Sequence, residues 1–169
     1  MSFGTNAQEV LPELSEKRVA QVKLSIEQDI KNLKIKSKFK DMPSYEVEFY
    51  VDTFRIEQLL ERCLNFEMSN ADRYMLYEQQ IKSYESLVTK YYFKLLSKLS
   101  IEDKKKLTTA LDAWKQYNKA QMDIIWLFQS DAYTIGGTVQ IDIAYSKIIG
   151  MVKSKVEELY DYYSQTIPS

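Results

Sequence analysis

The chain has 169 residues with 23 basic and 24 acidic side chains, and this near balance gives no positive field that would favour nucleic acid as a partner. It contains no histidine and one cysteine, which excludes Ser-His-Asp and Cys-His catalytic sites, an internal disulfide and a cysteine-rich zinc site. Four glycines and three prolines leave few turns, so the composition favours an all-α fold of long helices. No stretch approaches the about 20 apolar residues of a membrane span, and no cofactor or metal motif is found, so we expect neither a membrane span nor a cofactor.

The beginning of the chain is expected to differ from the rest. Residues 1–14 are predicted to be a flexible lead-in, and residues 15–169 a single helical domain. Thr5-Asn6-Ala7 before Gln8 is similar to the small-residue end of a secretory signal peptide, but the apolar segment that such a peptide needs does not precede it. A remnant of a signal peptide and a chance match both stay open.

The first helix is predicted to begin at Ser15 and to end in a lysine-rich stretch, Lys31–Lys40, which Pro43 closes. The lysines allow two interpretations. A solvated helix end, where the helix dipole favours cations, is preferred over a basic patch for an acidic partner or an anionic membrane. The apolar side chains of this helix recur at helical intervals: Val19, Val22, Ile26, Ile30 and Leu33.

The second helix is predicted to begin at Ser44 as a capping residue and to break near residues 67–72. Its apolar face is formed by Phe49, Ile56, Leu60 and Cys63, and we expect Cys63 to be a buried core thiol.

The third helix has the most regular pattern of the chain, an alternation of steps of three and four that is typical of a helix-packing seam. We favour internal packing for this seam, and keep a surface that binds a partner helix as the alternative. The members of the seam are Tyr74, Tyr77, Ile81, Tyr84, Val88, Tyr91 and Leu95.

The fourth helix is predicted to begin at Ser100, with Asp103 completing a near capping box. Its apolar face is predicted to hold Leu107, Leu111, Trp114 and Tyr117, with Trp114 in the core. Residues 122–129, Met-Asp-Ile-Ile-Trp-Leu-Phe-Gln, are apolar nearly all round and are therefore expected to be the most buried segment.

A glycine pair, Gly136 and Gly137, is predicted to separate the fourth helix, ending near Tyr133, from a fifth helix capped by Thr138. A tight antiparallel turn is the preferred interpretation. In the alternative, free amides at the helix start hold an anion or the carboxylate of a partner.

The fifth helix carries a strict apolar stripe, and the sequence therefore predicts an antiparallel bundle of about five helices. Paired carboxylates, such as Glu157 with Glu158 or Asp123 with Asp142, are interpreted as solvating groups, and no enzyme activity is expected. The stripe consists of Ile141, Tyr145, Ile148, Val152, Val156, Leu159 and Tyr163.

The second half of the chain, about residues 88–160, resembles the LprI-like family, small helical domains of the bacterial envelope named after a mycobacterial lipoprotein that inhibits lysozyme. The resemblance rests on "KYYFKLLSKLS", "LTTALDAWKQYNKAQ", "IGGT" and "VKSKVEEL". The chain departs from the family at Asn118, where arginine is usual, and at Met122 and Lys147, which lie near the usual cysteines, so the disulfide implied by the family is missing. The matching positions include Tyr92, Leu95, Leu96, Leu99, Leu107, Ala113, Trp114, Tyr117, Gly136, Gly137, Thr138, Lys155, Glu158 and Leu159.

The resemblance implies a periplasmic or secreted protein, and favours a non-catalytic binding protein that inhibits a lysozyme-like cell-wall hydrolase. Its predicted partner-binding site is the turn of Tyr133, Thr134, Gly136, Gly137 and Thr138. Tyr133 and Thr134 would enter the sugar-binding cleft, while exposed amides would meet the catalytic carboxylates of the hydrolase. The alternative is a structural or assembly module that associates, with itself or with a partner, through the tyrosine seam of the third helix.

Overall fold

The computed structural model describes residues 13–35, 39–129, 133 and 137–168, with the side chains of Lys34 and Ile35 excepted. Within these residues the chain forms five helices and no strand, so the predicted all-α fold is confirmed. The helices are α1 (Glu16–Ile35), α2 (Ser44–Cys63), α3 (Asn70–Leu96), α4 (Ile101–Leu127) and α5 (Thr138–Gln165). None of these helices combines the length and the apolar character that crossing a bilayer requires.

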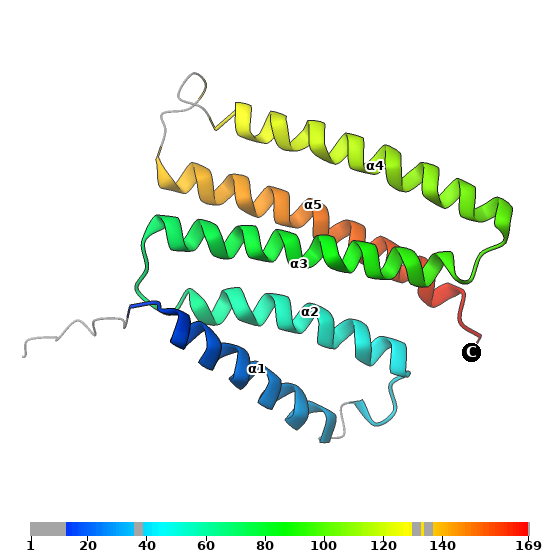
Figure 1. The fold of residues 1–169 in the computed structure, drawn as a ribbon, viewed down its shortest axis with the longest axis horizontal. Coiled ribbons are helices and arrows are strands. Elements are labelled where there is room, and N and C mark those ends of the chain that lie inside the picture. Colours follow the sequence, from blue (N-terminus) through cyan, green and yellow to red (C-terminus); the bar gives the residue numbers. More distant parts are fainter. Residues whose placement is uncertain (1–12, 36–38, 130–132, 134–136, 169) are drawn as a thin grey trace, which may run out of the picture.

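Consecutive helices run antiparallel in the bundle, and α3 and α5, which run in the same direction, are the central pair (Figure 1). The hairpin of α1 and α2 covers one side of α3 through α2. On the other side, α4 packs chiefly on α5 and forms the upper edge of the molecule in Figure 1. This order leaves α4 with packing neighbours on one flank only.

The predicted stripes of α3 and α5 meet in the larger of two apolar cores. Every residue of both stripes is buried or half-buried, which confirms that the tyrosine seam of α3 is an internal packing seam. Tyr84 and Tyr91 are among the largest fully buried side chains. The seam is therefore not exposed to a partner helix in this fold.

The hairpin of α1 and α2 has a smaller core of its own, closed by Leu76 from α3. Four of the five predicted apolar positions of α1, Val19, Val22, Ile26 and Ile30, lie in it, and Cys63 is fully buried, as expected for a core thiol. Burial raises the pKa of the Cys63 thiol. Before α1, the Leu14 amide donates to the Glu67 carbonyl at 2.7 Å, so this part of the lead-in is tied to the link between α2 and α3. The candidate signal-peptide end at residues 5–8 lies outside the described residues.

Three helix ends differ from the prediction. Pro43 does not close the first helix but occupies the N-cap position of α2, so that Ser44 is the first helical residue. Proline suits a helix start because its fixed φ is compatible with the helix and its missing N–H would have no partner there. Gly137, and not Thr138, is the N-cap of α5. The fourth helix ends at Leu127, before Tyr133, so the connection to α5 is longer than the predicted tight turn.

The predicted burial of α4 is wrong in two respects. Within residues 122–129 only Ile125 is buried, and Trp126, Leu127 and Phe128 are exposed. Tyr117 is 63% exposed, and the neighbouring Asn118 takes the inward position. The reason is the edge position of α4, because a helix with neighbours on one flank cannot bury an apolar circumference.

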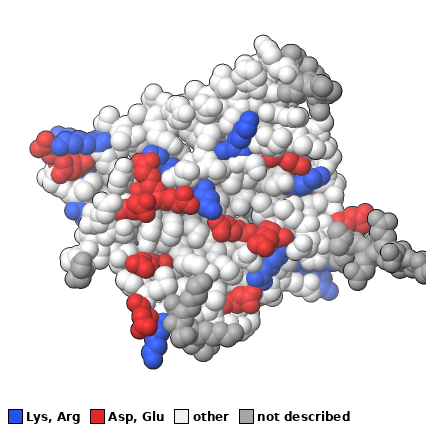
Figure 2. Space-filling view, turned by 180° about the vertical axis from the view of Figure 1, so that it is seen from behind, with Lys and Arg blue, Asp and Glu red and all other residues white. Residues whose placement is uncertain are grey.

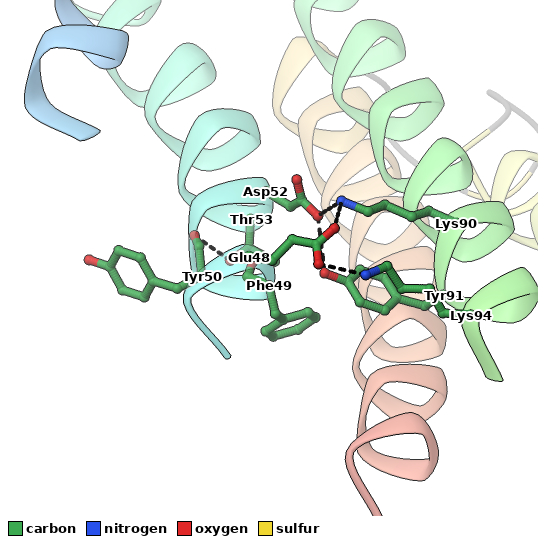
Figure 3. A network of polar contacts seen from close by, with 8 residues as sticks. All are labelled: Glu48, Phe49, Tyr50, Asp52, Thr53, Lys90, Tyr91 and Lys94. Carbon is green, nitrogen blue, oxygen red and sulfur yellow. Dashed lines mark hydrogen bonds and ion pairs between the residues drawn. The ribbon is translucent and has the colours of Figure 1, made fainter. Parts of the chain in front are cut away.

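Charged side chains tie α2 to α3 above the apolar core (Figure 3). Lys90 binds both Asp52 and Glu48, at 2.5 and 2.8 Å, and Lys94 binds the second Glu48 oxygen at 2.5 Å. The buried Tyr91 hydroxyl donates to Asp52 at 3.0 Å. Burial, and then the charge of Asp52, raise the pKa of Tyr91 well above its ordinary value. The network therefore gives a polar partner to the Tyr91 hydroxyl and to the ammonium groups of Lys90 and Lys94.

The core position Ile148 is expected to carry a large share of the packing energy. Ile148→Ala should lower the free energy of unfolding by about 2–5 kcal/mol, because it leaves a cavity between α3 and α5 where the side chain is 1% exposed. The matched control Ile101→Ala, at a position 78% exposed, should change it by less than about 0.5 kcal/mol. Urea unfolding measures both, and equal effects of the two substitutions would contradict the described core.

The raised pKa of Tyr91 predicts a loss of stability in alkali. In alkali the folded chain keeps the phenol proton of Tyr91, whereas the unfolded chain releases it. The protonated phenol therefore contributes its full stabilisation below the ordinary tyrosine pKa of 10.0, and this contribution declines as the pH rises above that value. Tyr91→Phe should reduce the decline in the free energy of unfolding by up to about 1.4 kcal/mol per pH unit. Urea unfolding between pH 9 and 11 provides the test, with the exposed Tyr117→Phe as control. The explanation fails if the free energy of unfolding declines with pH equally in Tyr91→Phe and in the native chain.

Candidate partner-binding surface

Exposed apolar side chains gather where α4 ends and α5 begins. We call this group the end surface, and its members are between 40% and 66% exposed. In the view of Figure 2, the surface along α4 beside the linker is largely uncharged. The end surface consists of Ile124, Leu127, Phe128, Tyr133, Val139 and Ile143.

The last turns of α4 explain why these side chains are exposed. Ile125 faces the core, and the Trp126 ring packs edge-on against Tyr145 of α5 with ring centroids 5.2 Å apart. The apolar run of α4 continues round the helix, so Ile124, Leu127 and Phe128 stay exposed, and Ile124 and Phe128 border a hollow between α4 and α5. Exposed apolar side chains that gather at one end of a bundle make that end a candidate interaction site.

Gly137 sets the direction in which α5 leaves this surface. Its φ of 114° and ψ of 160° lie in a region that is essentially restricted to glycine. The N-cap makes no side-chain hydrogen bond, and the first turn of α5 holds no acidic residue. The positive end of the helix dipole is therefore not compensated by a carboxylate of its own first turn, which favours an anionic group from outside.

A shallow hollow continues the end surface along α5. Its volume is about 430 Å³, and its lining includes Tyr77, Val139, Asp142 and Ile143. Asp142 accepts from the Arg73 guanidinium at 3.2 Å, and its other oxygen is buried without a hydrogen-bond partner. Burial first, and then Asp142, raise the pKa of Tyr77. The hollow thus has apolar walls and a carboxylate in its floor that is only partly satisfied.

The structure describes three of the five residues predicted for the turn. Tyr133 is exposed, with its ring 5.5 Å from that of Phe128, and Gly137 and Thr138 are exposed at the start of α5. Thr134 and Gly136 lie outside the described residues.

The residues of the family-like signature are placed mainly as structural groups. Lys155 of α5 lies over the ring of Trp114 of α4, 5.5 Å from its centroid, and binds Glu158 at 2.6 Å. Trp114 is half-buried against the larger core, as predicted, and Leu159 is buried within it. Tyr92 and Thr108 share a hydrogen bond of 2.9 Å between α3 and α4. Tyr117 faces solvent and joins none of these contacts.

The basic stretch Lys31–Lys40 is described only in part. Lys31 and Lys40 are exposed at the end of α1 and in the link to α2, while residues 36–38 lie outside the description. Among the described residues, no three acidic or cysteine side chains are grouped as a metal site.

Sequence reasoning missed the apolar residues of α4 and α5 that surround Tyr133. The signal was present, because residues 124–128 are apolar on more sides than a single packing face can bury. We interpreted this pattern as complete burial, whereas it is equally typical of a helix end that contacts a partner. The end surface offers apolar contact area and backbone amides, which suit binding more than proton transfer.

Comparisons with protein-family models, with curated proteins and with solved structures find no match to this chain. The fold and the end surface therefore define the class, an antiparallel five-helix bundle with an exposed apolar end. The resemblance to the LprI-like family stays a prediction.

The two described glycines predict opposite effects of alanine. Gly137→Ala should lower the free energy of unfolding by about 1–3 kcal/mol, because alanine is strained at this φ. Gly150→Ala, inside α5, should raise it by about 0.5–1 kcal/mol, because the added Cβ meets no atom within 4 Å and alanine favours the helix. Thermal unfolding compares the two. A Gly137→Ala variant as stable as the native chain would show that α5 does not need this backbone conformation.

Proposed function

We propose that this chain is a non-catalytic binding protein that docks its end surface on a partner protein. The observation that carries the proposal is the exposed apolar group around Phe128, Tyr133 and Val139. Apolar area of this kind contributes roughly 25 cal/mol per Å² when a partner covers it. The partner, by the family resemblance, is a lysozyme-like cell-wall hydrolase in the periplasm or outside the bacterial cell.

Tyr133 is the residue that enters the sugar-binding cleft of the hydrolase in this proposal. An aromatic ring stacks on the walls of such a cleft, and its hydroxyl replaces a sugar hydroxyl as a hydrogen-bonding group. Phe128 supports the ring of Tyr133 from the end of α4. The start of α5 presents backbone amides and the positive end of a dipole, which attract the catalytic carboxylates. Helices on both sides of the site limit the ordering cost of binding.

The competing function is self-association. The α3 seam, which the sequence offered as the surface for it, is buried inside the bundle. The end surface is also the candidate for self-association, since its apolar members are exposed. The two functions therefore share a surface but differ in what covers it.

Inhibition of cell-wall lysis tests the proposal directly. The native chain should inhibit at least one class of lysozyme, and Tyr133→Ala should weaken the inhibition at least tenfold, which corresponds to about 1.4 kcal/mol. The control is Tyr162→Ala, because Tyr162 is also exposed on α5 but lies about 36 Å along the helix from Thr138. Turbidity of a bacterial cell-wall suspension measures the residual lysis.

Lysozymes of several classes that stay fully active in a large excess of native chain would refute the inhibitor proposal. Light scattering on the same samples identifies the competing function. A dimer that Val139→Asp converts to a monomer would assign the end surface to self-association.

A further inference from the structure

A second hollow, apart from the end surface, lies between α3 and α4. It has a volume of about 560 Å³, which is within the range of small-molecule sites. We call it the tryptophan groove, because both tryptophans of the chain line it. Its apolar wall is formed by Val88, Trp114, Met122 and Trp126, and its rim carries Glu85, Thr89, Lys115, Lys119 and Asp123.

Asn118 is the single buried polar residue in the core of the described structure, and it lines this groove. Its side chain is 7% exposed. Its Nδ2 group donates to the sulfur of Met122 at 3.8 Å, whereas its Oδ1 atom is buried without a partner. An unsatisfied buried acceptor costs about 1–3 kcal/mol, and a leucine of similar size would avoid this cost. The fold therefore keeps a hydrogen-bond acceptor here that it does not itself use.

The walls of the groove are held in place from the α5 side. Lys155 lies over the Trp114 ring, and Tyr145 packs against the edge of Trp126. The two rings are fixed before any ligand arrives, which lowers the cost of binding. They are 12 positions apart on one helix, a separation of about 18 Å along its axis. The ligand that fits between them is elongated.

The charges on the rim indicate an uncharged ligand. Lys115 and Lys119 are balanced by Glu85 and Asp123, so the groove favours neither an anion nor a cation. A ligand that matches the groove is mainly apolar, because the wall between the rim charges is aromatic and aliphatic. At one point it must donate a hydrogen bond, since the free group of Asn118 is an acceptor.

We propose that the tryptophan groove binds an elongated neutral small molecule, with an apolar chain and one hydroxyl or amide N–H that donates to Asn118 Oδ1. Long-chain alcohols and fatty amides are the class of ligand. The proposal does not rest on the function of the end surface or on the identity of any protein partner. The Asn118 Nδ2 group already donates to the Met122 sulfur, so Oδ1 is the group of this amide that is left for a ligand.

Tryptophan fluorescence of the full chain tests this inference with two matched probes. 1-Decanol supplies an O–H donor, and decyl methyl ether has a similar chain without it. The native chain should show a saturable emission change with the alcohol and bind it at least tenfold more tightly than the ether. Absence of a saturable change with the alcohol, or equal affinities for the two probes, would overturn the proposal.

Two variants locate the site. Asn118→Leu should bind alcohol and ether equally, and its thermal midpoint should not fall, since the substitution removes an unpaired acceptor. Thr89→Phe, at an exposed position of the α3 wall, should obstruct the groove and weaken saturable binding of both probes, with circular dichroism as the check on folding. A preference for the alcohol that survives in Asn118→Leu would contradict the role of Asn118. Binding that is unchanged in a folded Thr89→Phe variant would place the ligand elsewhere.

Discussion

The packing of α3 against α5 is the constraint on which the rest of the structure depends. Each helix contributes a continuous apolar stripe, and together the stripes form most of the larger core. The α1–α2 hairpin reaches this pair through the apolar contacts of Phe49 and Ile56 and through the charged network of Lys90 with Asp52 and Glu48. The fourth helix attaches to the pair by its contact with α5. Both candidate sites are therefore formed on a helix that the central pair positions but does not surround.

The regular part of this fold could be predicted from the sequence because the apolar residues repeat at helical intervals and a neighbouring helix covers the face that they form. The apolar stripes of α3 and α5 repeat at helical intervals and pack against each other, so every stripe residue is buried or half-buried as expected. The first helix follows the same logic with a smaller core. In these helices the apolar pattern of one helix is sufficient to predict its burial, since another helix packs along its apolar face.

The fourth helix could not be predicted in this way. Its apolar residues extend round the helix, and the pattern does not say which flank has a neighbour. Tyr117 and Asn118 are adjacent, about 100° apart on the helix, and the aromatic residue was the natural choice for the inward position. The structure places the amide inside, which is why both the tryptophan groove and its free acceptor were missed. Tyr133 and Gly137 could be proposed from the sequence because a glycine pair indicates a turn whatever the packing.

The edge position of α4 also has a consequence for how the molecule opens. A helix secured along one flank can detach in a sub-global fluctuation that leaves the rest of the protein folded, and such units exchange their amide hydrogens sooner than the core. Detachment of α4 would separate the two walls of the tryptophan groove and displace Phe128 from the end surface. A molecule bound in the groove would oppose this opening, so that occupancy of one site holds the other in its binding geometry. The edge helix α4 is thereby the element that the two surfaces share.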